Sequence, residues 1–219
     1  MMFTRLESLI GNENLIKLKN TNVLIIGLGG VGGYAFEALV RSGIGSLTIV
    51  DNDVIELSNL NRQIITNQSN IGNLKVSEAK KRALNINPDV VINDLNIFVD
   101  DDNLDDLFKT KYDYVIDACD TVKTKILLID YCLNNNLKII SCLGTAKKMD
   151  PSRLKIMNLK DTNYDPLAKH LRKHFKDKDV KVVCSDEKVK DIADLGSNSF
   201  VPATASLLCA SYVINDIIK

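Results

Sequence analysis

The sequence has little of what marks several common protein classes: no tryptophan, four prolines, two histidines, and five cysteines of which no two form a C-x-x-C pair. Without such pairs, the usual ligand set of a structural zinc site is missing. An odd number of scattered cysteines, with no secretory leader, is typical of free thiols in a reducing cytoplasm. Basic and acidic residues balance at 28 each, so any attraction to nucleic acid has to be local.

Long apolar runs are also scarce. The one exception, residues 199–218 (SFVPATASLLCASYVINDII), contains a proline and several polar residues, and we expect a core helix there and no membrane span. The composition, 45% hydrophobic and 26% charged, is that of a globular protein. The length predicts a single domain over residues 1–219, with an N-terminal helix and nucleotide-binding core in 1–145 and a C-terminal extension in 146–219.

Short apolar runs alternate with amphipathic segments along the chain. Continuous apolar runs are typical of buried parallel strands, and apolar residues every three or four positions predict helices. The predicted strands are residues 22–27, 46–51, 90–99, 113–120 and 137–144. The predicted helices are residues 1–20, 34–45, 75–87, 124–136 and 165–175, the third of which stops before Pro88. This alternation implies right-handed crossovers and a doubly wound, mostly parallel α/β sheet of the Rossmann-like kind.

A glycine-rich turn, GLGGVGG, joins the first predicted strand to the next helix. Gly27, Gly29 and Gly32 match the G-x-G-x-x-G pattern, whose glycines allow a tight turn, an approach of backbone amides to phosphate, and close helix packing. Asp51 ends the second predicted strand, where a carboxylate accepts hydrogen bonds from ribose hydroxyls. The pattern predicts a nucleotide site but leaves open whether the ligand is NAD or a mononucleotide.

The polar loop that follows Asp51 favours a triphosphate. It contains Arg62 within the segment SNLNRQ and leads, past a glycine turn, to Lys75. Two cations near a phosphate-binding turn would neutralise the charge that develops as pyrophosphate leaves. Asp120 follows another predicted strand, at the sheet edge where ligands bind, and a carboxylate there can hold Mg²⁺ beside phosphate.

Four segments, GLGGVGG, VDNDVIELSNLNRQ, GNLK and IDACDT, resemble in order and spacing the ThiF/MoeB-type family of ATP-dependent adenylating enzymes, which is related to ubiquitin-activating enzymes. The resemblance implies these contacts with Mg-ATP: Gly30 with the nucleotide, Asp51 with the ribose, Asn59, Arg62 and Lys75 with the phosphates, and Asp120 with Mg²⁺. It also implies a homodimer, since Arg5 matches an arginine that the partner subunit contributes to the ATP site. Arg62, Lys75, Asp120 and Arg5 are therefore the candidate catalytic residues.

The C-terminal half resembles the members of this family that dehydrate threonylcarbamoyladenosine in bacterial tRNA. In that reaction ATP activates the carboxylate of the modified adenosine beside the anticodon, and a ring closes with loss of water. The implied partners are tRNA and, as an option, a sulfurtransferase-type protein. Residues 166–176 contain four Lys or Arg, two His and no acid, which makes them a candidate footprint for the RNA backbone. Cys119, next to Asp120, is expected to be a buried structural residue.

Two other functions remain open on the sequence. An adenylating activator of a ubiquitin-like sulfur-carrier protein fits the same motifs, although such enzymes usually hold zinc with two C-x-x-C pairs. An NAD-dependent oxidoreductase fits the glycine turn but leaves Arg62, Lys75 and the SNLNRQ loop unexplained. Ring closure within the substrate needs no cysteine carrier, because the nucleophile is already held close to the activated carboxylate. The sequence therefore favours the dehydratase.

Overall fold

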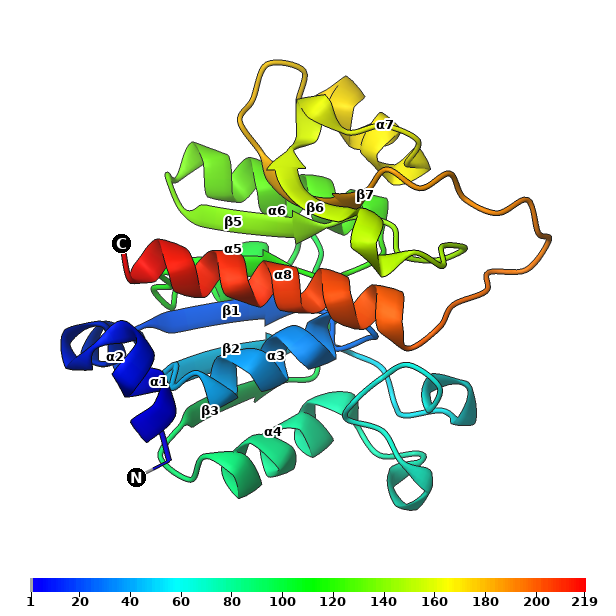
Figure 1. Ribbon diagram of the computed structural model, residues 1–219. Helices are drawn as coiled ribbons and strands as arrows, with labels where there is room; N and C mark the ends of the chain where they lie inside the picture. The colour runs from blue at the N-terminus through cyan, green and yellow to red at the C-terminus, as the bar shows by residue number, and fades with distance from the viewer. Residues whose placement is uncertain (1) are drawn as a thin grey trace.

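Seven short strands form one twisted sheet in the computed structural model, which describes residues 2–219 (Figure 1). The strand order is β3-β2-β1-β4-β5-β7-β6, and each neighbouring pair is parallel except β6 with β7. The strands are β1 (Asn22–Ile26), β2 (Ser46–Val50), β3 (Val91–Leu95), β4 (Tyr114–Asp117), β5 (Lys138–Cys142), β6 (Leu154–Asn158) and β7 (Lys181–Ser185). The doubly wound, mostly parallel α/β sheet predicted from the sequence is confirmed.

The central strands are apolar because both of their faces are covered by helices. The helices are α1 (Thr4–Ile10), α2 (Asn12–Lys19), α3 (Gly32–Arg41), α4 (Lys75–Ile86), α5 (Leu104–Leu107), α6 (Val122–Asn134), α7 (Pro166–His174) and α8 (Phe200–Ile217), with 3₁₀ turns at Leu57–Asn59, Gln68–Asn70, Pro151–Arg153 and Leu159–Asp161. One hydrophobic core joins the sheet to α2, α3, α4 and α8, and a second joins it to α5, α6 and α7. The sheet therefore separates two helical layers.

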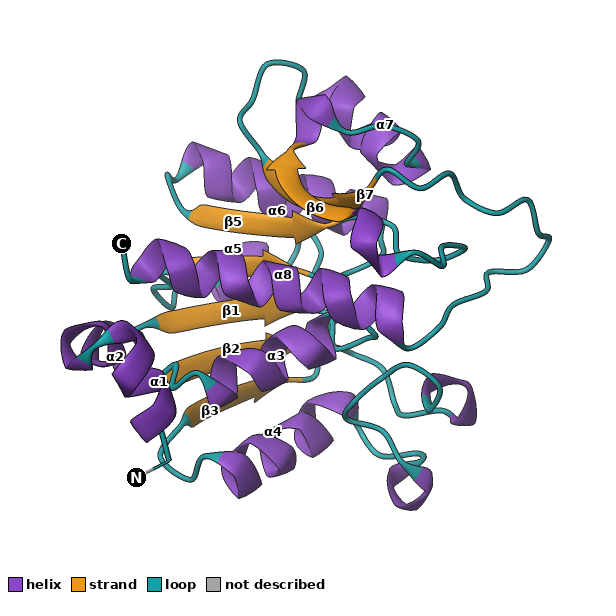
Figure 2. Ribbon diagram, viewed as in Figure 1, coloured by secondary structure: helices purple, strands orange, loops and turns teal. Residues whose placement is uncertain are grey.

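The carboxyl ends of the parallel strands meet at one side of the molecule. In register, Ile26 of β1 lies between Val50 of β2 and Asp117 of β4, so the residues that follow these three strands are neighbours. Long loops leave the sheet at this side, on the right in Figure 2. Three segments far apart in the sequence are brought together there, and this edge is where open α/β sheets bind ligands.

The apolar segment near the C-terminus forms α8, which is the one helix within residues 2–219 that is long and apolar enough to cross a membrane by length and composition. It packs along α3 and over the sheet next to β5 (Figure 1). Val201, Ala205, Cys209 and Val213 recur at helical spacing and are buried in the core. In this structure α8 is a core helix, as the sequence predicts.

The sequence prediction is wrong about the N-terminal helix. Residues 4–19 form two helices, α1 and α2, which are separated by Gly11 with φ of +81° and ψ of 159°. An L-residue rarely adopts this conformation and glycine does so readily, so the chain turns there.

The C-terminal extension also contains two strands that were not predicted: β7 pairs with β5, and β6 forms the antiparallel edge.

Candidate active site at the carboxyl ends of the strands

A cavity of about 760 Å³ lies at the carboxyl ends of β1, β2, β4 and β5. Its walls contain the glycine turn, the loop after β2, the first residue of α4, and the loops that follow β4 and β5. The candidate residues that line it are Gly27, Gly29, Gly30, Asp51, Asn59, Arg62, Lys75 and Asp120. Residues predicted from three distant parts of the sequence thus share one cavity.

The glycine turn exposes the backbone of Gly27, Gly29 and Gly30 to the cavity. Gly27 has φ of +89°, and a Cβ atom there would lie 2.8 Å from the Ala118 carbonyl oxygen. A Cβ atom on Gly32 would lie 1.7 Å from the Gly27 carbonyl oxygen, so α3 can begin against β1 only with glycine at this position. A Cβ atom on Gly29 would meet open space. An anion such as phosphate can therefore approach the backbone amides at the N-terminus of α3.

Asp51 is held in place by the backbone around it. One carboxylate oxygen accepts a hydrogen bond from the Leu28 amide at 2.6 Å, and the other accepts one from the Asp53 amide at 2.9 Å. Its side chain is 8% exposed. The carboxylate is thus oriented beside the glycine turn with lone pairs left over, because each oxygen can accept more than one hydrogen bond.

Lys75 is the first residue of α4, and its side chain is only 5% exposed. Its ammonium nitrogen lies 2.6 Å from an oxygen of Asp53 and 3.8 Å from an oxygen of Asp51. The pairing with Asp53 was not predicted from the sequence. It depends on the fold of the loop after β2, which returns through a bridge between Val54 and Leu74. A buried cation therefore faces the cavity, as the phosphate prediction requires.

Arg62, Asn59 and Gln63 come from the SNLNRQ segment. The Arg62 guanidinium donates to the Ser58 carbonyl oxygen at 2.8 Å and to the Asn61 side chain at 3.0 Å. The buried Asn59 side chain accepts a hydrogen bond from the Glu56 amide, so its oxygen shapes the loop. Gln63 is buried in the cavity wall, and its side-chain oxygen has no hydrogen-bond partner within residues 2–219. An acceptor left unpaired at a cavity is suited to a polar ligand.

Asp120 is an exposed carboxylate at the cavity, and it follows Cys119 in the loop after β4. No group of three or more His, Cys, Asp or Glu side chains within residues 2–219 could hold a metal ion. Magnesium is commonly held by one or two carboxylates together with substrate phosphates and water. Asp120 is therefore suited to hold Mg²⁺ only together with the phosphates of a bound nucleotide.

Cys119 is half-buried and lines the cavity, where the sequence predicts a buried residue, but its thiol is not activated. Burial, with the nearby negative charge of Asp117, raises the pKa of its thiol well above the ordinary value. The sulfur lies 3.0 Å from an Asp117 carboxylate oxygen and donates to it. Burial likewise raises the pKa of Cys184 to about 12. Neither thiol is a thiolate at neutral pH, and a nucleophilic cysteine must be one.

A buried ion pair lies beneath the cavity and was not found by sequence reasoning. Asp117 and Lys125 are both fully buried, and the Lys125 ammonium lies 3.0 Å from each carboxylate oxygen of Asp117. The Ser141 hydroxyl donates to Asp117 at 2.5 Å, and Lys125 donates to the Cys142 carbonyl oxygen at 2.7 Å. The pair therefore ties the ends of β4 and β5 to α6, directly behind the loops that line the cavity.

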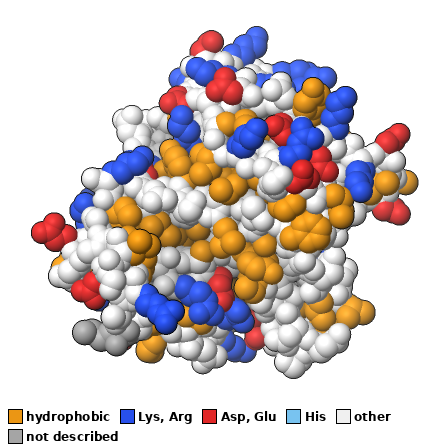
Figure 3. All heavy atoms as spheres, viewed as in Figure 1, with side chains coloured by type: hydrophobic (Ala, Val, Ile, Leu, Met, Phe, Trp, Pro, Cys, Tyr) orange, Lys and Arg blue, Asp and Glu red, His pale blue; other side chains and the backbone are white. Residues whose placement is uncertain are grey.

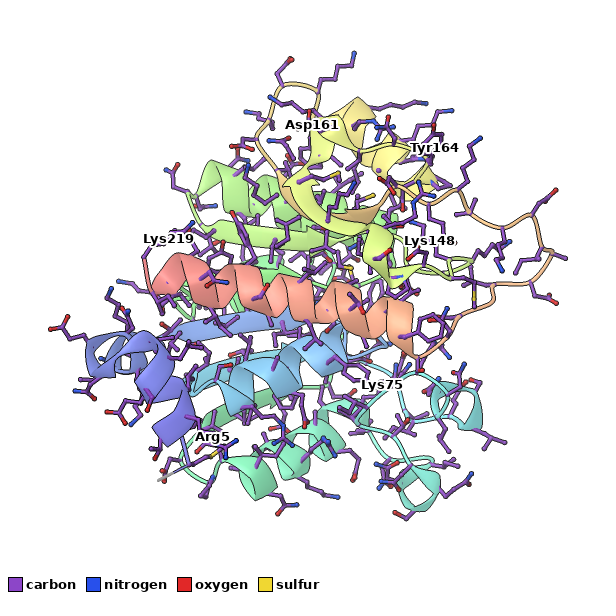
Figure 4. The ribbon with its side chains drawn as sticks, viewed as in Figure 1. Arg5, Lys75, Lys148, Asp161, Tyr164 and Lys219 are labelled. Atoms are coloured by element: carbon purple, nitrogen blue, oxygen red, sulfur yellow. The ribbon has the colours of Figure 1, made fainter. Side chains whose placement is uncertain are left out.

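Arg5 lies apart from the other candidate residues. It is exposed on α1 and does not line the cavity. Figure 4 shows it at the lower left beside α1, away from Lys75. The structure thus brings the predicted site residues together at the cavity with two exceptions. Gly32 packs against the Gly27 carbonyl behind the cavity wall, and Arg5 does not reach the cavity of its own chain.

Comparison with known proteins shows the family of this chain. The ThiF family matches residues 3–219. The Bacillus subtilis protein named tRNA threonylcarbamoyladenosine dehydratase is 38% identical over 99% of this chain and 94% of its own length. The crystal structure of Escherichia coli tRNA N6-threonylcarbamoyladenosine dehydratase in complex with ATP has a TM-score of 0.95 and 31% identity, over 99% of this chain and 93% of that one. This chain therefore belongs to the ThiF family.

Proposed function

We propose that this protein is an ATP-dependent tRNA threonylcarbamoyladenosine dehydratase. The observation that carries the proposal is the agreement along the full chain with enzymes of that name, in both sequence and structure. The cavity supports it, because it combines an open glycine turn, an oriented carboxylate and a buried cation in the manner of a nucleotide triphosphate site. An NAD-dependent oxidoreductase does not account for Lys75 or Arg62.

The residues that line the cavity have different roles in this proposed reaction. The glycine turn and the N-terminus of α3 bind phosphate, and Asp51 accepts hydrogen bonds from the ribose. Lys75 and Arg62 stabilise the negative charge that develops at phosphorus. When bound, ATP supplies the activation: the substrate carboxylate becomes an acyl-adenylate with release of pyrophosphate, and ring closure then releases AMP. No nucleophile from the protein is needed, in agreement with the high pKa of Cys119.

Three further assignments belong to the same proposal. Asp120 would hold Mg²⁺ together with the phosphates, since it is an exposed carboxylate at the cavity, whereas Asp53, which is also exposed there, is paired with Lys75. The protein acts as a homodimer in which Arg5 enters the cavity of the partner subunit, because it cannot reach its own. The cytoplasm is the proposed location, which fits five cysteines that are all free.

The test is to incubate the protein with Mg-ATP and tRNA that contains threonylcarbamoyladenosine, and then to digest the tRNA and weigh the nucleosides. The expected result is ATP-dependent loss of one water from that nucleoside. Reactions without ATP, and with tRNA lacking the threonylcarbamoyl group, are the controls. An unchanged nucleoside from a protein that binds ATP would contradict the proposal and favour a carrier-protein substrate.

A further inference from the structure

Tyr164, just before α7, combines exposure with backbone strain. It is 58% exposed and has φ of +57°, a left-handed conformation that is unusual for a bulky residue. No hydrogen bond involves its hydroxyl group within residues 2–219. The ammonium of Lys188 lies 5.3 Å from the centre of its ring, within the range of a cation–π contact. An aromatic ring is thus held out into solvent beside a cation.

The residues on either side fix this conformation. Thr162 is buried, and its carbonyl oxygen accepts a hydrogen bond from Arg172 at 2.7 Å. Asp165 caps α7 through a hydrogen bond from the Ala168 amide at 2.9 Å, and it also pairs with the buried Lys148 at 3.1 Å. The left-handed turn at Tyr164 therefore lies between two anchored residues. Their packing and hydrogen bonds offset the free energy of the strained backbone.

The same anchors connect Tyr164 to the active-site cavity. Lys148 donates to the Gly144 carbonyl oxygen at 2.8 Å, and Gly144 lines the cavity. A Cβ atom on Gly144 would lie 3.1 Å from a carboxylate oxygen of Asp165, so the Asp165 side chain packs closely against the Gly144 backbone. Leu167 in the first turn of α7 also lines the cavity. Figure 4 shows Tyr164 beside α7, near Lys148. Tyr164 therefore directly precedes Asp165, whose side chain contacts the cavity wall at Gly144.

Positive side chains that form no ion pair within residues 2–219 lie beside this ring and along α7. Lys169, Lys173 and Lys176 are exposed on or just after α7, and like Lys188 they form no ion pair within residues 2–219. The nearest acids along the chain from Lys188 are already engaged: Asp186 by Arg153 and Lys155, and Glu187 by backbone amides. Figure 3 shows lysine and arginine side chains over this end of the molecule, with acidic side chains among them.

We infer that Tyr164 is a stacking platform for an unpaired base of the tRNA loop, next to the modified adenosine that enters the cavity. Single-stranded RNA is recognised by aromatic side chains that stack on splayed bases, with cations along the backbone. Tyr164 provides the ring, and Lys188 with the α7 lysines provides the positive charge. The inference rests on the proposed function, since it takes tRNA as the substrate.

The test compares tRNA affinity between the wild-type protein and variants, using filter binding with tRNA that carries threonylcarbamoyladenosine. Tyr164→Ala is expected to weaken binding about tenfold or more, as loss of one base–aromatic stack does. Tyr164→Asn should do the same, and asparagine tolerates the left-handed backbone, so folding is preserved. Tyr164→Phe keeps the ring and should bind as the wild type does. Affinity for ATP should be unchanged in all three variants, because Tyr164 does not line the cavity.

Salt dependence separates stacking from charge. Replacing Lys173 by alanine should lower the slope of log affinity against log salt by roughly 0.7 to 0.9, the value for one lost phosphate contact. Tyr164→Ala should leave that slope unchanged. Lys111→Ala, an exposed lysine before β4 at the opposite end of the sheet, is the matched control and should change neither affinity nor slope.

Two outcomes would overturn the inference in different ways. In the first, the wild-type protein dehydrates the tRNA, and Tyr164→Ala and Tyr164→Asn bind this tRNA as tightly as the wild type does. The stacking platform is then wrong, while the proposed function stands. If the wild-type protein neither binds nor dehydrates this tRNA, the proposed function is wrong, and the platform with it.

Discussion

Lys75 is a buried cation that already holds an anion, the Asp53 carboxylate at 2.6 Å. If it stabilises the charge on the departing phosphate, Lys75→Ala should lower the rate constant of the chemical step by roughly a hundredfold or more, and Arg62→Ala should act in the same direction. Single-turnover kinetics with saturating ATP measure this. Lys80→Ala, on the same helix but paired at the surface with Asp94, is the control and should retain full turnover. Near-normal turnover in both active-site variants would refute the phosphate assignment.

At the same scale, Cys119 lies next to a candidate catalytic carboxylate but has a protonated thiol. Because burial raises its pKa far above neutral, the thiolate that reacts with alkylating reagents is scarce at pH 8. Iodoacetamide should therefore label Cys119 much more slowly in the folded protein than in the denatured chain, as peptide mass spectrometry can measure. Cys119→Ala should keep dehydratase activity. Loss of activity in a variant that still folds and binds ATP would point to a role for the thiol in the reaction.

At the scale of elements, the Asp117–Lys125 pair joins β4, β5 and α6. Burial disfavours the Lys125 cation, but attraction to Asp117 outweighs it and raises the pKa of Lys125 to about 12. The stabilisation is thus fully present below the ordinary lysine pKa of 10.5 and is lost as the pH rises through about 12. Lys125→Met, which leaves a buried unpaired carboxylate, should lower the free energy of unfolding by about 3–5 kcal/mol.

Urea denaturation at pH 7 measures this difference. Lys123→Met removes an exposed lysine of the same helix, and we expect a change of less than about 1 kcal/mol. Adding Asp117→Asn to Lys125→Met should recover part of the loss, because the uncompensated charge is then removed. If Lys125→Met were as stable as Lys123→Met, the buried pair would contribute little to the fold.

The elements of the nucleotide half could be predicted because their signals are local. The run NVLIIG, the spacing of Gly27 and Gly32, and the acid at Asp51 each follow from neighbouring residues. Lys125 could not be predicted, since a lysine within an amphipathic helix is usually solvated. The contacts of Asp53 and Gln63 depend on how the loop after β2 folds back, and strands β6 and β7 depend on a free sheet edge. Those are tertiary effects, which override local preference.

At the scale of the whole molecule, variants of Arg5 can show whether two chains of a homodimer share one ATP site. Arg5→Ala and Lys75→Ala should each impair activity as homodimers. In a mixed dimer of the two variants, one cavity would combine an intact Lys75 with an intact Arg5 from the partner subunit, so activity should return to about half the wild-type value. Differently tagged subunits, co-expressed and purified through both tags, allow this measurement. A mixed dimer as inactive as its parents would contradict a shared site.

The two backbone hydrogen bonds that Asp51 accepts have a consequence for the thermodynamics of nucleotide binding. The Leu28 and Asp53 amides restrict its carboxylate before any ligand arrives. A side chain that is already immobilised loses little conformational entropy on association, whereas a mobile one at an interface costs about 0.5–1.5 kcal/mol. The Asp51 carboxylate therefore accepts hydrogen bonds from the ribose without rearranging. Less of the enthalpy gained in these hydrogen bonds is offset by lost side-chain entropy, and the nucleotide binds more tightly.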